Sequence, residues 1–370
     1  MAAPITPNSP PSPALAPTPT GSPLISAPAR ILIIRPSALG DVCRSVPLLT
    51  SLRRAWPAAR IDWLVNSAFS GAIAAHPALS GVVPFDRRAL GRWWSPRALH
   101  HLRTFLAGLR SAHYDLVIDA QGLARSALFA RVTGAPIRIG PADARECGTL
   151  AYTIAAPVSQ THTVDRMLEL LAPLNIDPVR DLRLYAPADA LTRLHSHPDL
   201  RTKRYAILAP TSRWPGKRWA PDRFTAVAGE LLRRHANQLD AVVIVGAASE
   251  RDQCGPLLAA AAANSAIIDC LGKTSVADLM ALVASASLVI ANDSAAVHMA
   301  TGFNRPMVAL YGPTDIAKVG PYHQQSSVIQ HRRATDVLDH KNTLSGLDMM
   351  DRITIDQVLA QADASLRTPP

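Results

Sequence analysis

The sequence has few cysteines and no long hydrophobic run, and each absence narrows the class of protein. Its 370 residues include four cysteines, Cys43, Cys147, Cys254 and Cys270, whose wide spacing forms neither a CxxC pair nor a Cys/His metal site. We therefore expect free thiols in a reducing cytoplasm. No run of about 18 apolar residues occurs. Prolines interrupt the N-terminal segment, so the sequence predicts neither a spanning helix nor a secretion signal.

The first 29 residues have no charged side chains. Residues 1–29 consist mainly of Pro, Ala, Ser and Thr, a composition that favours extended, solvated backbone. We expect this disordered, Pro-rich tail to take no part in the fold. The remaining length suits about two domains, and a hydrophobic content of 48% supplies a core for each.

Basic side chains outnumber acidic ones along the rest of the chain. There are 38 Lys and Arg against 28 Asp and Glu, and residues 1–200 hold 20 of the basic and 13 of the acidic ones. Such a charge attracts a nucleic acid, an acidic membrane surface or a phosphorylated substrate. An arginine-rich genome gives the same excess, so charge alone does not choose among them.

Short apolar runs alternate with helix-like stretches from residue 31 onward. Strands are predicted at residues 31–34, 60–65, 82–85, 114–119, 137–140, 205–209, 241–245, 266–271, 288–291 and 307–311. Helices are predicted at 42–55, 96–110, 123–132, 221–234, 249–263, 275–286 and 295–302. Parallel strands need crossover connections, so this alternation predicts an α/β protein with two doubly wound, Rossmann-like parallel sheets.

The polar, Pro-containing stretch 177–204 is the predicted connection between the two sheets. We expect an N-terminal domain over residues 30–185 and a C-terminal domain over 186–370. A last helix at 354–366 is compatible with packing on either domain. Ligands of such sheets bind beyond the carboxyl ends of the strands, so chemistry is expected in the loops that follow strands.

Two such loops lie in the first domain. Residues 35–42 include Asp41, which is either an N-cap of the following helix or a carboxylate that takes a proton from a substrate hydroxyl. Residues 119–126 include Gln121, Arg125 and Ser126, which are candidates to face the same cleft and contact an acceptor. Ordinary turn and capping chemistry is the alternative for this second loop.

Two further loops lie in the second domain. Residues 210–219 combine Thr211, Ser212 and three cations, which suits a diphosphate held by Lys217 or Arg218; a solvated basic loop is the alternative. The strand that ends in Asp293 and Ser294 runs straight into a helix, where backbone amides can meet a phosphate. His298 lies one turn later and is either a ligand contact or a buried core residue.

A basic and aromatic stretch at residues 87–94 precedes leucines at helical spacing, Leu99, Leu102, Leu106 and Leu109. Such a surface suits a phosphorylated lipid acceptor at the cytoplasmic face of a membrane. Leucines that face the domain core, with solvated arginines, are the alternative.

Together, the four loops resemble the heptosyltransferases of glycosyltransferase family 9, which build the inner core of lipopolysaccharide. The resemblance spans residues 30–325 and is carried by the stretches 37–41, 119–123, 217–219, 292–294 and 311–315. It implies a GT-B fold, with the acceptor on the N-terminal domain and a nucleotide-diphosphate heptose on the C-terminal domain. In one departure, Ala295 stands where the family usually has glycine.

The resemblance also implies roles for individual residues. Asp41 is similar to the catalytic base, and Lys217 to the lysine on the donor diphosphate. The other donor contacts that it implies are Thr211, Ser212, Glu250, Asp293, Ser294 and His298. The implied enzyme is an inverting, metal-independent transferase of ADP-heptose that uses no cofactor. It is expected in the cytoplasm, with peripheral contact at the inner membrane and no nucleic-acid partner.

Other classes of function are weighed by what they require. A nicotinamide oxidoreductase needs a G-x-G-x-x-G turn after the first strand, and none occurs there. A related transferase with another nucleotide sugar or acceptor stays open, as does a non-catalytic protein that binds nucleotide sugars. No D-x-D triplet occurs, so the sequence calls for no metal.

Overall fold

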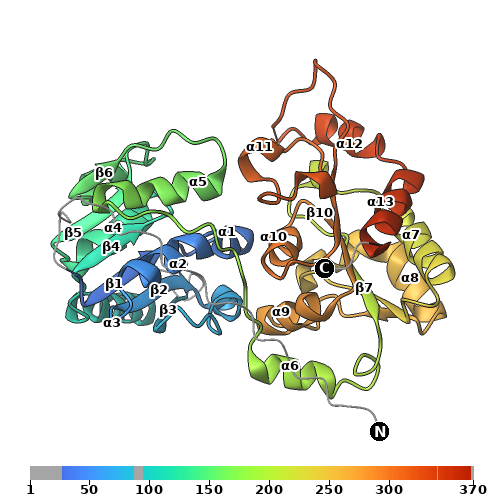
Figure 1. Cartoon of the computed structure of the whole chain (residues 1–370), viewed down its shortest axis with the longest axis horizontal. Helices are drawn as coiled ribbons and strands as arrows, with labels where there is room; N and C mark the ends of the chain where they lie inside the picture. The colour runs from blue at the N-terminus through green and yellow to red at the C-terminus, as the bar shows by residue number, and fades with distance from the viewer. Residues whose placement is uncertain (1–26, 87–94, 340, 368–370) are drawn as a thin grey trace, which may run out of the picture.

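The protein has two parallel six-stranded sheets, one in each half of the chain, and each sheet forms the centre of its own domain (Figure 1). The computed structural model describes residues 27–86, 95–339 and 341–367; the predicted basic and aromatic stretch 87–94 lies outside these residues. The strand order is β3-β2-β1-β4-β5-β6 in the first sheet and β12-β11-β10-β7-β8-β9 in the second. Both are doubly wound orders, which confirms the predicted α/β class.

The strands of the first sheet are β1 (Arg30–Ile34), β2 (Arg60–Asn66), β3 (Gly81–Phe85), β4 (Leu116–Asp119), β5 (Ile137–Pro141) and β6 (Ile154–Ala156). Those of the second are β7 (Tyr205–Ala209), β8 (Ala241–Ile244), β9 (Ile267–Asp269), β10 (Leu288–Asn292), β11 (Met307–Leu310) and β12 (Val328–Ile329). Every predicted strand is present with small shifts at its ends. The short edge strands β6 and β12 were not predicted.

The helices of the first domain are α1 (Leu39–Arg44), α2 (Val46–Ala55), α3 (Pro96–Ser111), α4 (Ala124–Thr133) and α5 (Thr163–Leu168). The remaining helices are α6 (Ala188–His195), α7 (Pro221–Arg234), α8 (Gly255–Ala263), α9 (Val276–Ser285), α10 (Ala295–Gly302), α11 (Ile316–Val319), α12 (Thr343–Asp351) and α13 (Ile355–Arg367). Short 3-10 helices η1 (Ser67–Ala72), η2 (Gly148–Ala151), η3 (Glu169–Leu174), η4 (Pro215–Lys217), η5 (Ala248–Cys254) and η6 (Gln325–Ser327) lie between them.

Strand β1 shows how the sequence places two cores on the first sheet. Its last four residues are completely buried, and side chains alternate between the faces of a strand. Ile31 and Ile33 therefore join the core under α1, α2 and α5, which continues into the second domain. Leu32 and Ile34 join a separate core under α3 and α4. Helices α3 and α4 thus cover the face of the sheet that is turned away from the second domain.

The prediction of one continuous helix over residues 42–55 is wrong, because the chain forms two helices, α1 and α2, there. The two helices meet at Ser45, which caps the end of α1 and the start of α2. Pro47 lies in the first turn of α2, where a missing N–H costs nothing. The break directs α1, with Asp41, toward the second domain.

The connection between the sheets contains α6, which packs against α9 of the second domain. The last helix, α13, packs against α7, β10 and β11. Its apolar face, Val358, Leu359 and Ala362, is part of the second domain's core. Of the two placements compatible with the sequence, α13 takes the one on the C-terminal domain.

The two domains touch where α1 meets α10 (Figure 1). A Cβ atom added to Gly40 of α1 would lie 2.7 Å from Cδ2 of His298 in α10. Real Cβ atoms essentially never approach another atom so closely, so the contact requires glycine at position 40. It brings the loop after β1 against the loop after β10.

Helix α12 holds the loop that carries Lys217. A Cβ atom added to Gly346 would lie 2.5 Å from the carbonyl oxygen of Gly216, the residue before Lys217. Helix α12 and η4 therefore pack backbone against backbone. Position 346 lies far from the motifs that the sequence singles out.

All four cysteines are free, which confirms the prediction of unpaired thiols. Three of them are buried, and Cys147 is exposed. Within the described ranges, the structure has no helix that combines the length and the apolar character needed to cross a membrane.

Substitution Gly346→Ala should displace η4 and lower the free energy of unfolding by about 1–3 kcal/mol, because the added methyl group overlaps the backbone of Gly216. Urea denaturation measures the change. Gly229→Ala in α7 is the matched control, since nothing lies within 4 Å of its added Cβ. That substitution should leave stability unchanged or raise it by about 0.5–1 kcal/mol. Equal stability of the two variants would contradict the close packing of α12 on η4.

Candidate active site

The strand-end loops singled out by the sequence gather where the two domains meet. The loop with Asp41 follows β1 and the loop from Asp119 follows β4, which is the neighbour of β1. In the second domain, the loop with Lys217 follows β7 and the loop with Asp293 follows β10, again a neighbouring strand. These are the positions where each doubly wound sheet reverses its strand order, which is where ligands bind in such folds.

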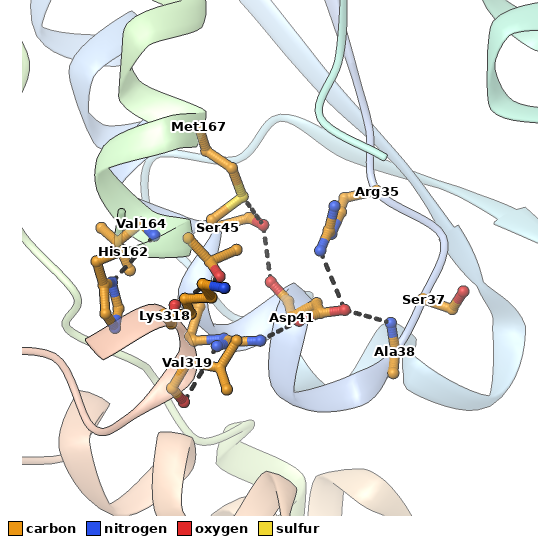
Figure 2. Close-up of polar contacts among 12 residues, drawn as sticks. Arg35, Ser37, Ala38, Asp41, Ser45, His162, Val164, Met167, Lys318 and Val319 are labelled. Atoms are coloured by element: carbon orange, nitrogen blue, oxygen red, sulfur yellow. Dashed lines mark hydrogen bonds and ion pairs between the residues drawn. The ribbon is translucent and has the colours of Figure 1, made fainter. Parts of the chain in front are cut away.

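Asp41 lies between two arginine side chains (Figure 2). Nη2 of Arg35, the residue after β1, is 3.0 Å from Oδ2 of Asp41. Arg44, three residues further along α1, pairs with Oδ1. The backbone N–H of Ala38 also donates to Oδ2 at 3.1 Å. The N-cap of α1 is Ala38. The alternative prediction, that Asp41 is the N-cap, is therefore wrong.

The arginines decide the protonation state of Asp41. Burial raises the pKa of this carboxyl, but the charges of Arg35 and Arg44, with the hydrogen bond from Ala38, outweigh burial. The pKa of Asp41 consequently lies well below its usual range. The side chain remains 24% exposed. Asp41 is thus an anion at neutral pH that a ligand in the cleft can reach.

Arg44 links Asp41 to the other domain. Its side chain is buried, and Nη1 donates to the carbonyl oxygen of Val319 at 3.3 Å. The ring Nε2 of His162 lies 3.1 Å from the carbonyl oxygen of Gly320, the next residue. Carbonyls at the end of a helix have no partner within the helix. Side chains of the first domain therefore satisfy the end of α11 in the second.

A pocket of about 210 Å³ opens beside Asp41 in the first domain. Arg35 lines it together with Arg145 and Arg166, and the single acidic side chain in its wall is Asp143, which pairs with Arg166. Its other lining residues are Ala120, Gln121, Gly122, Pro141, Ala144, Val158, Thr163, Met167 and Leu170. Asp41 and Asp143 balance two of the three guanidinium groups, and the third leaves the pocket with a positive charge that suits an anionic ligand.

Of the three predicted acceptor residues, Gln121 lines this pocket and Arg125 and Ser126 do not. Oε1 of Gln121 accepts the backbone N–H of Ser37 at 3.3 Å, which joins its loop to that of Asp41. Ser126 is buried, and its hydroxyl bonds to the backbone of Leu123 in the first turn of α4. Arg125 is exposed on α4. A contact of Arg125 or Ser126 with an acceptor stays a prediction.

Asp119 performs the capping role that was the alternative for its loop. It is fully buried, and Oδ1 accepts the backbone N–H groups of Gln121 and Gly122. Oδ2 accepts the hydroxyl of Tyr152 at 2.7 Å. Burial raises the pKa of Asp119. Its oxygens are used to hold the turn that presents Gln121.

Lys217 and Asp293 form an ion pair in the second domain. Their Nζ and Oδ2 atoms are 2.6 Å apart, and the side chains are 14% and 9% exposed. The hydroxyl of Thr314 donates to the same oxygen at 2.6 Å. The loops after β7, β10 and β11 are therefore tied at one point. Within the described ranges, no three His, Cys, Asp or Glu side chains are grouped to hold a metal ion.

Thr211 and Ser212 lie beside this pair, both buried. The hydroxyl of Thr211 donates to Oε2 of Glu250 at 2.7 Å, and the backbone N–H of Ala247 donates to the same oxygen at 3.2 Å. These bonds orient Glu250 toward the loop after β7. Arg218 donates from Nε to the carbonyl oxygen of Ser212 at 2.8 Å. Arg218 therefore braces the loop, and Lys217 is the cation that meets Asp293.

Ser294 and His298 lie at the start of α10. Ser294 is the N-cap, and its side chain makes no capping hydrogen bond. His298 is 6% exposed and packs on Gly40, as expected for a buried residue, but its Nδ1 has no hydrogen-bond partner. Burial, followed by the charge of Arg44, holds the pKa of His298 well below its usual value. The ring is therefore neutral at physiological pH.

Asn292 lies at the end of β10, in a stretch that carries the resemblance, but the sequence assigned it no role. It is completely buried, and Nδ2 donates to the carbonyl oxygen of Pro210 at 2.6 Å. Its Oδ1 accepts the backbone N–H of Trp219 at 3.2 Å. Asn292 thus holds both ends of the Lys217 loop. Its place at the end of a buried strand was the available signal, because a buried amide there needs backbone partners.

The chain matches the model of the family described as glycosyltransferase family 9 (heptosyltransferase) over residues 102–346. It is 32% identical over 302 residues to lipopolysaccharide heptosyltransferase 1 of Pseudomonas aeruginosa, covering 79% of this chain and 81% of the relative. It is 28% identical over 311 residues to lipopolysaccharide heptosyltransferase 1 of Escherichia coli K12, covering 82% of this chain and 94% of the relative.

Solved structures show the same fold. The structure of E. coli ADP-heptose lps heptosyltransferase II has a TM-score of 0.74 at 22% identity, over 91% of this chain and 98% of that one. E. coli heptosyltransferase WaaC with ADP-2-deoxy-2-fluoro heptose has a TM-score of 0.71 at 24% identity, over 90% and 99%. The two-domain arrangement expected from the sequence is therefore confirmed as that of the heptosyltransferases.

Substitution Lys217→Met should leave the largely buried carboxylate of Asp293 without its cation and cost about 3 kcal/mol of stability. Lys217→Met combined with Asp293→Asn should recover most of that loss, because the unpaired charge is gone. Urea denaturation of the single and double variants measures the coupling. Lys273→Met is the control, since its pair with Asp269 is 60% exposed on the lysine side and should cost no more than about 1 kcal/mol. Additive losses at positions 217 and 293 would contradict the buried ion pair.

Proposed function

Since the chain belongs to glycosyltransferase family 9, the heptosyltransferases, we propose that it moves a heptose from ADP-heptose to the inner core of lipopolysaccharide. Its relatives over most of its length are lipopolysaccharide heptosyltransferases. One observation carries the proposal: the ionised carboxylate of Asp41 pairs with Arg35 of the arginine-lined pocket and lies on α1, which packs on α10, the helix that directly follows the Asp293 partner of Lys217. A transferase needs a proton acceptor at the junction of its two substrates.

The donor site is proposed in the second domain. Lys217 supplies positive charge for the diphosphate, and the free amides at the start of α10, beside Ser294, supply donors. Thr211 and Ser212 add hydroxyls, and Glu250 suits the hydroxyls of a ribose. We propose that Asp293 and His298 contact the sugar. Nδ1 of His298 has no hydrogen-bond partner in the described part of the protein, and a sugar hydroxyl can supply one.

The chemical step proposed is a direct, inverting displacement. The acceptor oxygen forms a bond to the anomeric carbon of the heptose as the bond from that carbon to the diphosphate oxygen breaks. The proton of the acceptor hydroxyl goes to Asp41, and ADP leaves with the electron pair of the broken bond. Lys217 and the α10 amides stabilise the negative charge that develops on ADP.

The acceptor is proposed to place an anionic group in the pocket of Arg35, Arg145 and Arg166. Arg35 both lines this pocket and pairs with Asp41. An acceptor anion therefore competes with Asp41 for the Arg35 guanidinium. Loss of that partner raises the pKa of Asp41 and makes it a stronger proton acceptor. Acceptor binding thus prepares the base.

Transfer without a metal ion stays a prediction, supported by the lack of a D-x-D triplet and by the cationic groups available for the diphosphate. We also propose a cytoplasmic location with peripheral contact at the inner membrane, which free thiols and a lipid-linked acceptor support. A related transferase that uses another nucleotide sugar or acceptor, and a non-catalytic nucleotide-sugar binder, are the alternatives.

Substitution Asp41→Asn should lower the rate of heptose transfer by about 10²–10⁴-fold, because the amide cannot accept the proton. Binding of ADP should persist, since Asp41 lies outside the proposed donor contacts. Transfer is measured with ADP-heptose and a truncated lipopolysaccharide, and ADP binding by calorimetry.

Asp189→Asn is the control, because this carboxylate is exposed on α6 and pairs with Arg193. It should leave both measurements unchanged. Turnover retained in Asp41→Asn would remove the role of Asp41 as base. ADP binding by a wild-type protein that shows no transfer to any truncated lipopolysaccharide would favour the non-catalytic alternative.

A further inference from the structure

The outer layer of the first domain is formed by α3, α4 and η2. Helix α3 packs on α4, and α4 packs on η2. Helices α3 and α4 cover the face of the sheet opposite to α1, which contacts the second domain. Among the residues that the structure describes, the second domain therefore leaves the outward sides of these elements uncovered.

This layer carries positive charge and very little negative charge. Neither α3 nor α4 contains an Asp or Glu, whereas five arginines lie on them. These are Arg97, Arg103, Arg110, Arg125 and Arg131, all exposed. Of the acidic residues near them in sequence, Asp119 is fully buried, Asp143 pairs with Arg166, Glu146 accepts the backbone N–H of Ala124, and Asp115 accepts the backbone N–H groups of residues 29 and 30. The layer therefore has a positive surface.

Exposed leucines alternate with the arginines. Leu99 is 40% exposed, Leu128 51% and Leu150 of η2 84%. Leu99 lies four residues before Arg103, and Leu128 lies three residues from both Arg125 and Arg131. Such spacings place the side chains on one side of a helix. The alternative that these leucines face the core holds for Leu109, which is buried, and for Leu106, which packs against the same core, but not for Leu99.

We propose that the outward face of α3, α4 and η2 docks on an anionic lipid surface. Arginines attract acidic headgroups, and leucines on the same face can enter the boundary between headgroups and acyl chains. A surface for nucleic acid has no need of exposed leucines. The choice of lipid also rests on the proposed function, whose acceptor is lipid-linked. Helix α4 and η2 flank residues 121–122 and 144–145 of the acceptor pocket, so docking brings that pocket to the membrane.

The test is flotation of the full chain with vesicles of phosphatidylcholine, either alone or with about 30 mol% phosphatidylglycerol. The wild type should bind the anionic vesicles and not the neutral ones, and binding should weaken as salt is raised. Arg103→Glu with Arg131→Glu should reduce binding by about tenfold or more. Leu128→Ser with Leu150→Ser should reduce it by about tenfold.

Leu344→Ser is the matched control. Leu344 is 82% exposed, close to the value for Leu150, but lies on α12 beside Asp348 and Asp351. It should leave vesicle binding unchanged. Arg201→Glu, an exposed arginine before β7, is the control for charge and should have little effect.

Several vesicle results would overturn the proposal. The proposed face is not the docking surface if the wild type fails to bind anionic vesicles, or if the control variants lose as much binding as the variants of α3, α4 and η2. Equal binding to neutral vesicles removes the role of charge. Vesicle binding that survives the leucine substitutions, with duplex DNA bound as tightly, indicates a nucleic-acid surface instead.

A separate measurement tests the proposed function. Transfer to a deacylated, water-soluble acceptor should be normal in all variants. Failure of that reaction in the wild type counts against the proposed function and leaves the vesicle result standing.

Discussion

The ion pair of one carboxylate with two guanidinium groups is the interaction on which the rest of the site depends. Asp41 neutralises part of the charge of Arg35 and Arg44, two side chains that are almost completely buried. Without Asp41, their burial would be costly. Arg44 also reaches Val319 in the second domain, so the group that fixes α1 contributes to the contact between domains. The position of Asp41, the proposed proton acceptor, is thereby coupled to the position of the second domain.

The two domains present different charged groups to the space between them. The first domain presents arginines around a pocket, whereas the second ties Lys217, Asp293 and Thr314 at the ends of three strands. Each sheet places its loops at the point where the strand order reverses. Gly40 lets the two sets approach, because any side chain there would overlap the ring of His298. A carboxylate at the junction can then serve a substrate bound from either side.

Much of this fold could be predicted from the sequence, because its strands are short apolar runs and its helices have clear starts. Helix α7 begins at Pro221 and ends at Arg234 as predicted, whereas the break at Ser45 was missed although Pro47 signalled it. Asp41 and Lys217 were singled out because they lie in loops that follow strands, and both form ion pairs in the structure, whereas their catalytic and binding roles stay predictions. Arg44 could not be assigned, since its partner Val319 lies 275 residues away. Gly346 acts through a contact with the distant backbone of Gly216, which its local sequence does not show. The buried position of Asn292 signalled a need for backbone partners but not that they are Pro210 and Trp219.

The most direct test of the central claim is the pH dependence of kcat/KM for transfer, compared between the wild type and Arg44→Gln. Arg44 helps to hold the pKa of Asp41 below its usual range. If Asp41 is the proposed base it must be ionised to act, so activity should fall as the pH drops through that pKa. Removing one of the two cations should move this acid limb to higher pH by about one unit or more, whatever the change in the maximal rate. An acid limb at the same pH in both proteins would contradict the account.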